Sequence, residues 1–121
     1  MKTTIPILRS FDEAKAKEFY VDFLGFKVEW EHRFSEGMPL YMELRRGECI
    51  LHVSEHHGDC SPGSAVRIET PGIDDYLKGL RESGYKNCRP GKAELQPWGL
   101  REIVITDPFG NRITLYETAE G

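Results

Sequence analysis

His52 is the side chain in this sequence whose type is best suited to chemistry, and it lies in the strand-like segment CILHVSE. An imidazole can act as a general base, bind a metal ion or contact a ligand, because its charge changes near neutral pH. The alternative is a hydrogen-bonded histidine in a half-buried strand. The sequence offers no acid or nucleophile that can be paired with His52, so its role stays open at this stage.

A second candidate for chemistry is the polar segment EHHGDC. Its possible zinc ligands are His56, His57, Asp59 and Cys60. Structural zinc sites do use such side chains. Adjacent histidines on a polar turn are nevertheless usually solvated, so we expect no specific metal site in this segment.

Trp98 lies in QPWGL, where a proline and a glycine flank the indole side chain. These neighbours predict a shaped loop or a bulge at a strand edge, where a core tryptophan is less expected. An indole face can stack on a planar ligand, and a core position is the alternative. Trp30 differs, because Phe26 and Val28 share its strand face in FKVEWEHRF. We expect Trp30 in the core.

Two amphipathic helices are predicted, and each ends at a glycine. The first begins at Ser10, which could form a capping box with Glu13, and it ends at Gly25. The second runs from Pro71 to Gly84. The apolar side chains that face one way on this second helix are Ile73, Leu77 and Leu80.

Each helix is preceded by one strand-like segment and followed by three. These segments are TIPILR, FKVEWEHRF, LYMELRR and CILHVSE in the first half, and SAVRIE, AELQPW, REIVIT and RITLYE in the second. The predicted order is therefore βαβββ, twice. Within the last hairpins Gly47 matches Gly110, and with one residue of slack His52 falls opposite Thr114. The repeat predicts two modules, about 1–56 and 63–118, joined by the turn-rich HHGDCSPGS within a single domain of residues 1–121.

Composition narrows the class of protein. The 121 residues suffice for one ordinary domain with its own core. A net charge of −4 without a Lys/Arg stripe argues against a nucleic-acid partner and fits a cationic small ligand. No apolar run approaches a membrane span or a secretory leader, so we expect a cytoplasmic protein with no membrane partner. The odd set of three cysteines lacks an evident base partner and predicts reduced packing or surface thiols, namely Cys49, Cys60 and Cys88.

The tandem βαβββ modules, FYVDFLGF at the end of the first helix and DPFGNRITLYE near the end of the chain resemble the vicinal oxygen chelate superfamily. This superfamily includes glyoxalase I, extradiol dioxygenases and bleomycin-binding resistance proteins. The stretches LYMELRRGECILHVSEH and AELQPWGLREIVITDPFG look most like the bleomycin-binding group. The resemblance implies an α+β fold, in which two βαβββ modules form a curved eight-stranded sheet, or cup, with helices on its outer face.

The catalytic members of that superfamily hold a divalent metal through four strand positions. By resemblance, these positions correspond here to Ile5, His52, Gly63 or Ser64, and Thr114. Only His52 is a competent ligand, whereas a Lewis-acid site needs about three protein ligands. We therefore expect no metal and no other cofactor.

The resemblance also nominates ligand-binding residues. The tryptophan of the QPWG motif lines the ligand groove in the bleomycin-binding group, which nominates Trp98. The segment RFSEGMPLY borders that groove and nominates Phe34, Met38 and Tyr41, with a hairpin loop carrying ordinary apolar anchors as the alternative. His52 and Thr114 complete the expected set.

These expectations lead to a metal-free binding protein that sequesters a small, planar, cationic molecule, with a bleomycin-type antibiotic as the implied ligand. The alternative is an enzyme, a glyoxalase-like lyase or isomerase or a dioxygenase, that acts on a small oxygenated metabolite through His52. A third candidate is an acidic interaction protein without a small ligand. The resemblance further implies a homodimer whose cups are lined by both chains, with the N-terminal strand and helix exchanged in some relatives.

Overall fold

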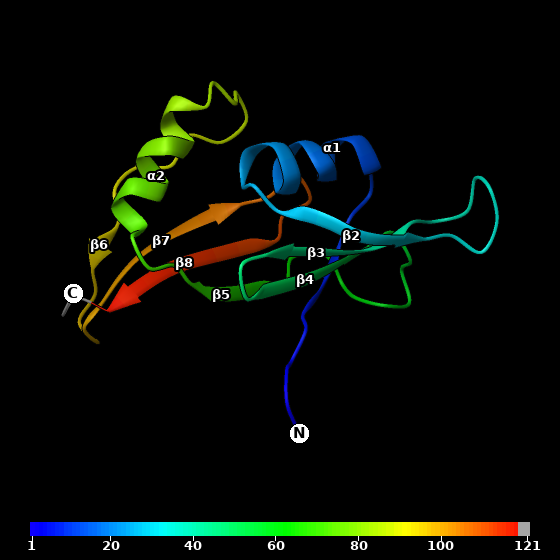
Figure 1. The fold of residues 1–121 in the computed structure, drawn as a ribbon, viewed down its shortest axis with the longest axis horizontal. Helices are drawn as coiled ribbons and strands as arrows, with labels where there is room; N and C mark the ends of the chain where they lie inside the picture. The colour runs from blue at the N-terminus through cyan, green and yellow to red at the C-terminus, as the bar shows by residue number, and fades with distance from the viewer. Residues whose placement is uncertain (119–121) are drawn as a thin grey trace. The chain divides into compact units, whose positions relative to one another are not determined.

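The computed structural model describes residues 1–118, in which two βαβββ sets of elements follow one another along the chain (Figure 1). The first set is β1 (Ile7–Arg9), α1 (Glu13–Lys17) with its continuation η1, a π-helix (Glu18–Phe23), β2 (Lys27–His32), β3 (Tyr41–Arg46) and β4 (Cys49–Ser54). The second set is β5 (Ala65–Glu69), α2 (Ile73–Glu82), β6 (Glu94–Leu95), β7 (Leu100–Thr106) and β8 (Arg112–Thr118). The predicted α+β class and the repeated order are confirmed.

The chain divides into two compact units. The first unit comprises Met1–Ser64 together with Pro108–Asn111, and the second comprises Ala65–Asp107 and the chain from Arg112 onward. Each unit holds one four-stranded sheet, with the order β1-β4-β3-β2 in the first unit and β5-β8-β7-β6 in the second. The eight predicted strands therefore form two four-stranded sheets, one for each module.

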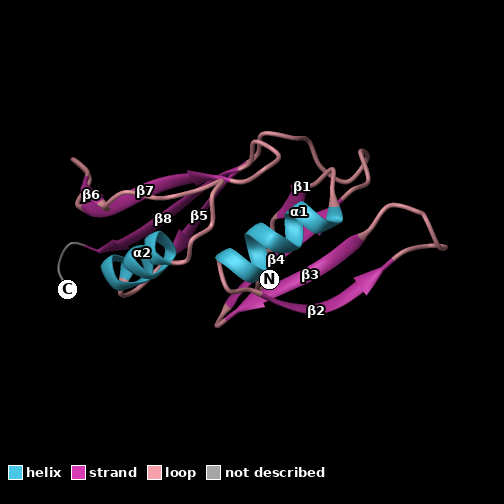
Figure 2. Cartoon of the chain, turned by 90° about the horizontal axis from the view of Figure 1, so that it is seen from above, coloured by secondary structure: helices cyan, strands magenta, loops and turns pink. Residues whose placement is uncertain are grey.

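The first sheet has a helix-covered face and an open face (Figure 2). Along β3 and β4, buried apolar side chains alternate with partly exposed ones. The buried ones share the core with aromatic side chains of η1, and together they are Met42, Leu44, Leu51, Val53, Phe19, Tyr20 and Phe23. Tyr41, Glu43 and His52 alternate with the buried residues and lie on the open face.

A bulge in β2 moves Trp30 to this open face. Val28 pairs with Leu44 of the helix-covered face, whereas Trp30 pairs with Glu43 of the open face. Glu29 is therefore an extra residue in β2, and the strand changes face there. The prediction that Trp30 lies in the core is wrong, because its side chain is 43% exposed.

The first helix begins at a different cap from the predicted one. The Asp12 side chain accepts a hydrogen bond from the Lys15 N–H at 3.0 Å and caps α1. Ser10 is buried, and its backbone N–H donates to the Ser54 carbonyl at 2.9 Å. The predicted Ser10 cap is wrong because Ser10 still follows the course of β1 beside β4. Gly25 ends the helical segment with a φ of 88°.

The second unit is organised in the same way. Leu77 and Leu80 of α2 are buried as predicted, together with Ile73. They share the core with alternate residues of β7 and β8, namely Ile105, Ile113 and Leu115. Glu102, Val104 and Thr114 occupy the alternating positions and lie on the open face of the second sheet.

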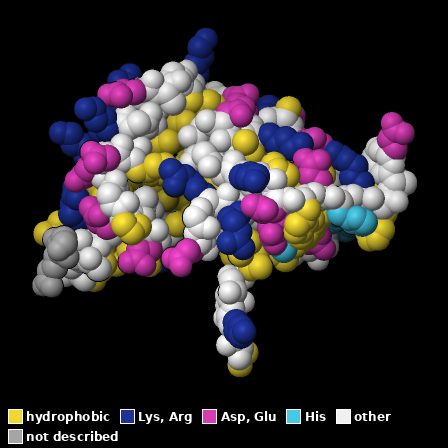
Figure 3. All heavy atoms as spheres, viewed as in Figure 1, with side chains coloured by type: hydrophobic (Ala, Val, Ile, Leu, Met, Phe, Trp, Pro, Cys, Tyr) yellow, Lys and Arg dark blue, Asp and Glu magenta, His cyan; other side chains and the backbone are white. Residues whose placement is uncertain are grey.

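The predicted strand at AELQPW is shorter than expected. Only Glu94 and Leu95 pair with β7, because the chain turns at Gln96. Across the described residues, Lys and Arg side chains are interspersed with Asp and Glu on the face shown in Figure 3. None of the helices within residues 1–118 has the length and apolar character needed to cross a membrane.

Candidate functional site

In the second unit, a tight turn holds Trp98 at the tip of the hairpin between β6 and β7. The Gly99 N–H donates to the Gln96 carbonyl at 2.9 Å, and the Gln96 N–H donates to the Leu100 carbonyl at 2.8 Å. Gly99 has a φ of 89°, a conformation that glycine adopts readily. The indole is 62% exposed, which excludes the alternative of a core tryptophan.

The Trp98 ring is oriented by a carboxylate. Its Nε1–H donates to Glu102 Oε2 at 2.7 Å, and the Arg67 guanidinium also donates to both oxygens of Glu102. The hydrogen bonds from Arg67, and then the one from Trp98, lower the pKa of Glu102. The Arg67 guanidinium lies over the Tyr116 ring at 5.1 Å from its centroid. An ionised Glu102 side chain thus joins β5, β7 and the Trp98 turn.

A hollow of about 490 Å³ opens beside Trp98. Its walls include the indole, Glu102 and Val104, and Val104 is itself 56% exposed. An aromatic face, an apolar side chain and a few polar groups are the usual lining of a small-molecule site. The geometry suits a flat ligand that stacks on Trp98.

In the first unit, the structure supplies the partners that the sequence could not assign to His52. Its Nδ1 lies 2.6 Å from the Tyr41 hydroxyl, and its Nε2 lies 2.9 Å from Glu43 Oε1. Glu43 is the direct cross-strand partner of His52, and Tyr41 lies two residues before Glu43 on the same strand. The period-two pattern of LYMELRR was the signal that could have found Glu43.

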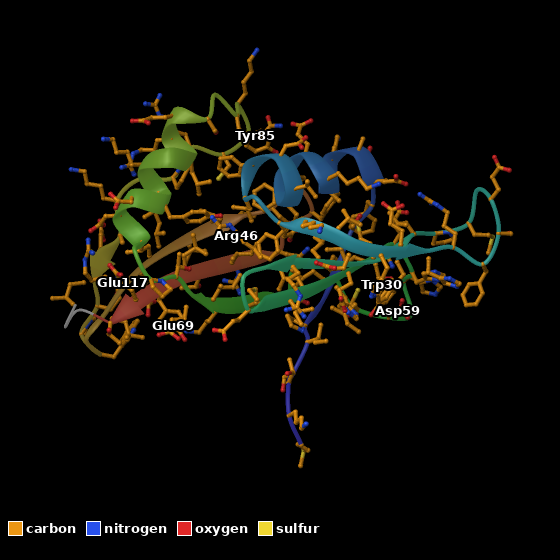
Figure 4. The ribbon with its side chains drawn as sticks, in the orientation of Figure 1. Trp30, Arg46, Asp59, Glu69, Tyr85 and Glu117 are labelled. Atoms are coloured by element: carbon orange, nitrogen blue, oxygen red, sulfur yellow. The ribbon has the colours of Figure 1, made fainter. Side chains whose placement is uncertain are left out.

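Two aromatic contacts extend this group. The Trp30 ring is stacked on Tyr41 with centroids 5.8 Å apart and an interplanar angle of 8°. The His52 ring lies edge-on to both, 5.3 Å from Trp30 and 5.2 Å from Tyr41. Figure 4 shows Trp30 on the side of β2 that faces away from α1. We call Trp30, Tyr41, Glu43 and His52 the first-unit cluster.

Two nominated residues lie in the loop between β2 and β3, outside the first-unit cluster. Phe34 is 76% exposed, and its ring contacts the edges of His32 and His56. The Met38 carbonyl accepts a hydrogen bond from Arg33. Met38 also lines a hollow that is separate from the one beside Trp98. The structure therefore joins Tyr41 to His52 within the first unit. Trp98 and Thr114 belong to the second unit.

The residues paired with His52 and Thr114 on the neighbouring parallel strands do not fit a metal ion. They are not Ile5 and Gly63 or Ser64, the positions that the resemblance implied. Ile7 lies directly across from His52 on β1, and Arg67 lies directly across from Thr114 on β5. An aliphatic, a guanidinium and a threonine add no competent ligand. Both His52 nitrogens are also engaged by other side chains. Within residues 1–118, no group of three or more His, Cys, Asp or Glu side chains is arranged to hold a metal.

The EHHGDC segment is bound into local structure. Asp59 accepts a hydrogen bond from the Ser54 hydroxyl at 2.7 Å, and the His56 N–H donates to the same hydroxyl oxygen at 3.0 Å. Burial raises the pKa of the Cys60 thiol, and it does the same for Cys49 and Cys88. A raised pKa keeps a thiol protonated, which is the opposite of what a cysteine nucleophile requires.

One known protein family matches this sequence along its whole length. The model of a family described as "Glyoxalase superfamily protein" matches residues 1–121. The chain belongs to the glyoxalase superfamily. The resemblance inferred from the repeated modules and the DPFGN hairpin is confirmed. A comparison with curated proteins finds no match.

Solved structures with the same fold include antibiotic-binding proteins. A bleomycin-binding protein complexed with bleomycin is 22% identical, with a TM-score of 0.76 and coverage of 98% of this chain and 99% of that one. The bleomycin resistance determinant encoded on the transposon Tn5 is 22% identical, with a TM-score of 0.77 and 98% coverage of both chains. TnmS3, an antibiotic binding protein from Streptomyces sp. CB03234, is 20% identical, with a TM-score of 0.71 and coverage of 98% and 96%. At these identities the likeness shows a shared fold.

Proposed function

We propose that this glyoxalase superfamily protein binds and sequesters a small, planar, cationic molecule of the bleomycin type. The observation that carries the proposal is the exposed Trp98 indole, held by Glu102 at the edge of a hollow. An indole fixed in this way offers a flat surface with little rotamer entropy left to lose on binding. The net charge of −4 favours a cation over an anion.

Structural relatives support the same class of ligand. Two of the similar structures are described as bleomycin-binding or bleomycin resistance proteins, and a third as antibiotic binding. We propose Trp98 as the main stacking surface, with Thr114 beside the hollow on the open face. We propose His52, Tyr41, Phe34 and Met38 as further ligand contacts from the first unit.

The enzyme alternative is less well supported by the first-unit cluster. A metal-dependent mechanism lacks ligands at three of the four expected positions, as described above. The enzyme alternative acts through His52, whose ring nitrogens are already bonded to Tyr41 and Glu43. A general-base mechanism that passes through the Tyr41 hydroxyl would require an easily ionised hydroxyl. Burial, followed by the charges of Asp59, Cys60 and Glu43, instead raises the pKa of Tyr41. A neutral hydroxyl in a hydrogen-bonded network is better suited to recognition than to proton abstraction.

We also propose that the chain is a single domain that forms a homodimer, with ligand sites lined by both copies, and that it works in the cytoplasm. A two-fold dimer is the commonest closed assembly of one chain. The cell would then be protected because the protein binds the drug, and not because it modifies the drug chemically.

Titration with metal-free bleomycin tests the proposal. A ligand that binds only the folded protein raises the free energy of unfolding by RT ln(1 + [L]/Kd), so the unfolding temperature keeps rising with ligand concentration. We expect such a logarithmic rise, together with quantitative recovery of unmodified bleomycin by mass spectrometry after the complex is denatured. An unmoved unfolding temperature would reject sequestration of this drug, and a modified drug would favour the enzyme alternative.

A further inference from the structure

The two open faces carry the same four kinds of side chain. In the second unit, Glu102 links the Trp98 indole to Arg67, and Arg67 lies over Tyr116. In the first unit, the cluster contains Trp30, Tyr41, Glu43 and His52. Each unit thus combines a tryptophan, a tyrosine, a glutamate and a basic side chain. Trp98 and Glu102 of the second-unit set line the hollow of the proposed drug site, so the first-unit cluster is a candidate for a second ligand site.

The first-unit cluster has an accessible aromatic surface beside a carboxylate. Trp30 keeps 43% of its surface exposed although its ring stacks on Tyr41. Glu43 lies directly across from Trp30 on the neighbouring strand. The side chains of His52 and Glu43 are only 15% and 18% exposed, respectively, so the carboxylate lies in a partly desolvated place. Charge interactions are stronger in such a place than in bulk water.

The hydrogen bonds of the cluster determine which groups it can receive. A carboxylate only accepts hydrogen bonds, so the His52 Nε2 that faces Glu43 carries the proton. In the neutral ring, Nδ1 is then an acceptor and receives the Tyr41 O–H. The Tyr41 oxygen keeps its lone pairs for an incoming donor. The cluster therefore offers acceptors to a ligand: the Tyr41 oxygen and the oxygens of Glu43.

The two carboxylates differ in their partners. Glu102 is bonded by a guanidinium, a permanent cation that offsets its charge. Glu43 is bonded by an imidazole instead. Within residues 1–118, no permanent cation is paired with Glu43 in the way that Arg67 is paired with Glu102. A cationic ligand group should therefore be attracted more strongly to the first-unit cluster than to the Trp98 site.

We propose that the first-unit cluster is a binding site for a planar group that bears cationic N–H donors, such as an amidinium or an aminopyrimidinium. The ring stacks on Trp30, and its N–H groups donate to the Tyr41 oxygen and to Glu43. His52 is a positioning residue that fixes the Tyr41 hydroxyl. The proposal deepens the proposed function, on which it rests for the biological ligand, but its chemistry can be tested separately.

The two tryptophans allow this test, because each unit contains one. In a Trp98→Phe chain all tryptophan emission comes from Trp30. We expect benzamidinium, a planar aromatic amidinium, to quench that emission saturably at millimolar concentration, as befits a fragment. Benzamide, which has a similar shape without the charge, should bind at least about tenfold more weakly, because a charged hydrogen bond is lost.

A matched variant tests the carboxylate. Glu43→Gln preserves the shape of the side chain and removes the charge, so it should weaken benzamidinium binding by about tenfold or more and leave benzamide unchanged. Equal quenching by the two probes, no quenching by either, or unchanged affinity in a folded Glu43→Gln chain would each overturn the proposal. If circular dichroism shows that Glu43→Gln is unfolded, the comparison of benzamidinium with benzamide in the Trp98→Phe chain decides alone.

A titration of the Trp30→Phe chain with bleomycin tests the proposed function separately from the first-unit site. There, emission reports only on Trp98 and therefore on the proposed function. Quenching of Trp98 without benzamidinium binding at Trp30 would retain drug sequestration and reject the first-unit site. The reverse result would retain the first-unit site and reject the stacking role of Trp98.

Discussion

Trp98 combines exposure with a fixed ring orientation, so its substitution should separate binding from stability. We expect Trp98→Ala to weaken bleomycin binding by about ten- to a hundredfold, roughly 1 to 3 kcal/mol for one stacked aromatic contact. The free energy of unfolding should change by less than about 1 kcal/mol, because the side chain is 62% exposed. Calorimetric titration and chemical denaturation measure the two quantities.

The matched controls are a ring-preserving variant and a core variant from the same unit. Trp98→Phe keeps a stacking face and loses the N–H donor to Glu102, so it should retain more affinity than Trp98→Ala. Leu77→Ala empties a fully buried site and should cost about 2 to 5 kcal/mol of stability. If Trp98→Ala destabilised the protein as much as Leu77→Ala, the stacking assignment would fail.

The cysteines give a prediction about reactivity. Burial raises the pKa of the Cys49, Cys60 and Cys88 thiols, and the thiolate is the reactive form. At neutral pH we expect the folded protein to react with a disulfide reagent more slowly than glutathione does. All three thiols should react once the protein is denatured. A single thiol that outpaced glutathione would reveal an activated cysteine.

The exposed turn at Trp98 was predictable from sequence, whereas the position of Trp30 was not, for a physical reason. Flanking proline and glycine are local signals of a turn, and they indicate an exposed tip without knowledge of the sheet. The position of Trp30 depends on a bulge at Glu29, which becomes visible only when the strand is paired with β3. The partners of His52 likewise required the register between β3 and β4. A turn set by neighbouring residues in the sequence was predictable, whereas the contacts made between paired strands were not.

At the scale of elements, the N-terminus of α1 offers a direct test of its cap. Asp12→Ala removes the side-chain acceptor for the Lys15 N–H and should lower the free energy of unfolding by about 1 kcal/mol. Asp12→Asn keeps an acceptor and should preserve most of that stability. Urea denaturation of the three chains provides the measurement. Identical midpoints for wild type and Asp12→Ala would contradict the capping role.

The ion pair between β5 and β7 should make stability depend on pH. Arg67 and Glu102 flank β8, and their hydrogen bonds lower the pKa of Glu102 below its usual value of 4.5. A carboxyl whose pKa is lower in the folded state stabilises the fold above the unfolded pKa, and this contribution is lost as pH falls through the folded pKa.

The comparison of wild type with Glu102→Gln isolates this effect. Their difference in free energy of unfolding should be constant above about pH 4.5 and should shrink as the pH falls below that value. The effect should be modest, because half of the Arg67 side chain is exposed. A difference that grew on acidification would contradict the assigned direction of the pKa shift.

Element boundaries were predictable where the signal was periodic. The apolar face of α2, at Ile73, Leu77 and Leu80, follows from helical spacing alone and is buried. The start of α1 was misplaced, because Ser10 and Asp12 are both good caps and only tertiary pairing of Ser10 with Ser54 distinguishes them. The strand predicted at AELQPW shortened to β6 because the turn at Gln96 closed earlier than the apolar pattern suggested.

At the scale of the whole molecule, we expect a homodimer. Light scattering at micromolar concentration should report twice the mass of the 13.9 kDa chain. Dilution should leave that mass unchanged over a wide range if both copies line the ligand site. A monomer at micromolar concentration would remove the dimer from the proposal and leave the two sites within one chain to be tested as they stand.

Asn111 has a consequence for how this protein is made. It is fully buried in the first unit, where its Nδ2 donates to the Arg9 carbonyl at 2.8 Å and its Oδ1 accepts from the Ser64 N–H at 3.2 Å. The hairpin tip Pro108–Asn111 thus completes a unit that begins at the other end of the chain. During synthesis the first unit cannot acquire these bonds until residue 111 has left the ribosome, when β5, α2, β6 and β7 of the second unit have already been translated. The first unit is therefore expected to complete its fold only after most of the second unit has been made, and a fragment that ends at Ser64 should be less stable than the same unit in the full chain.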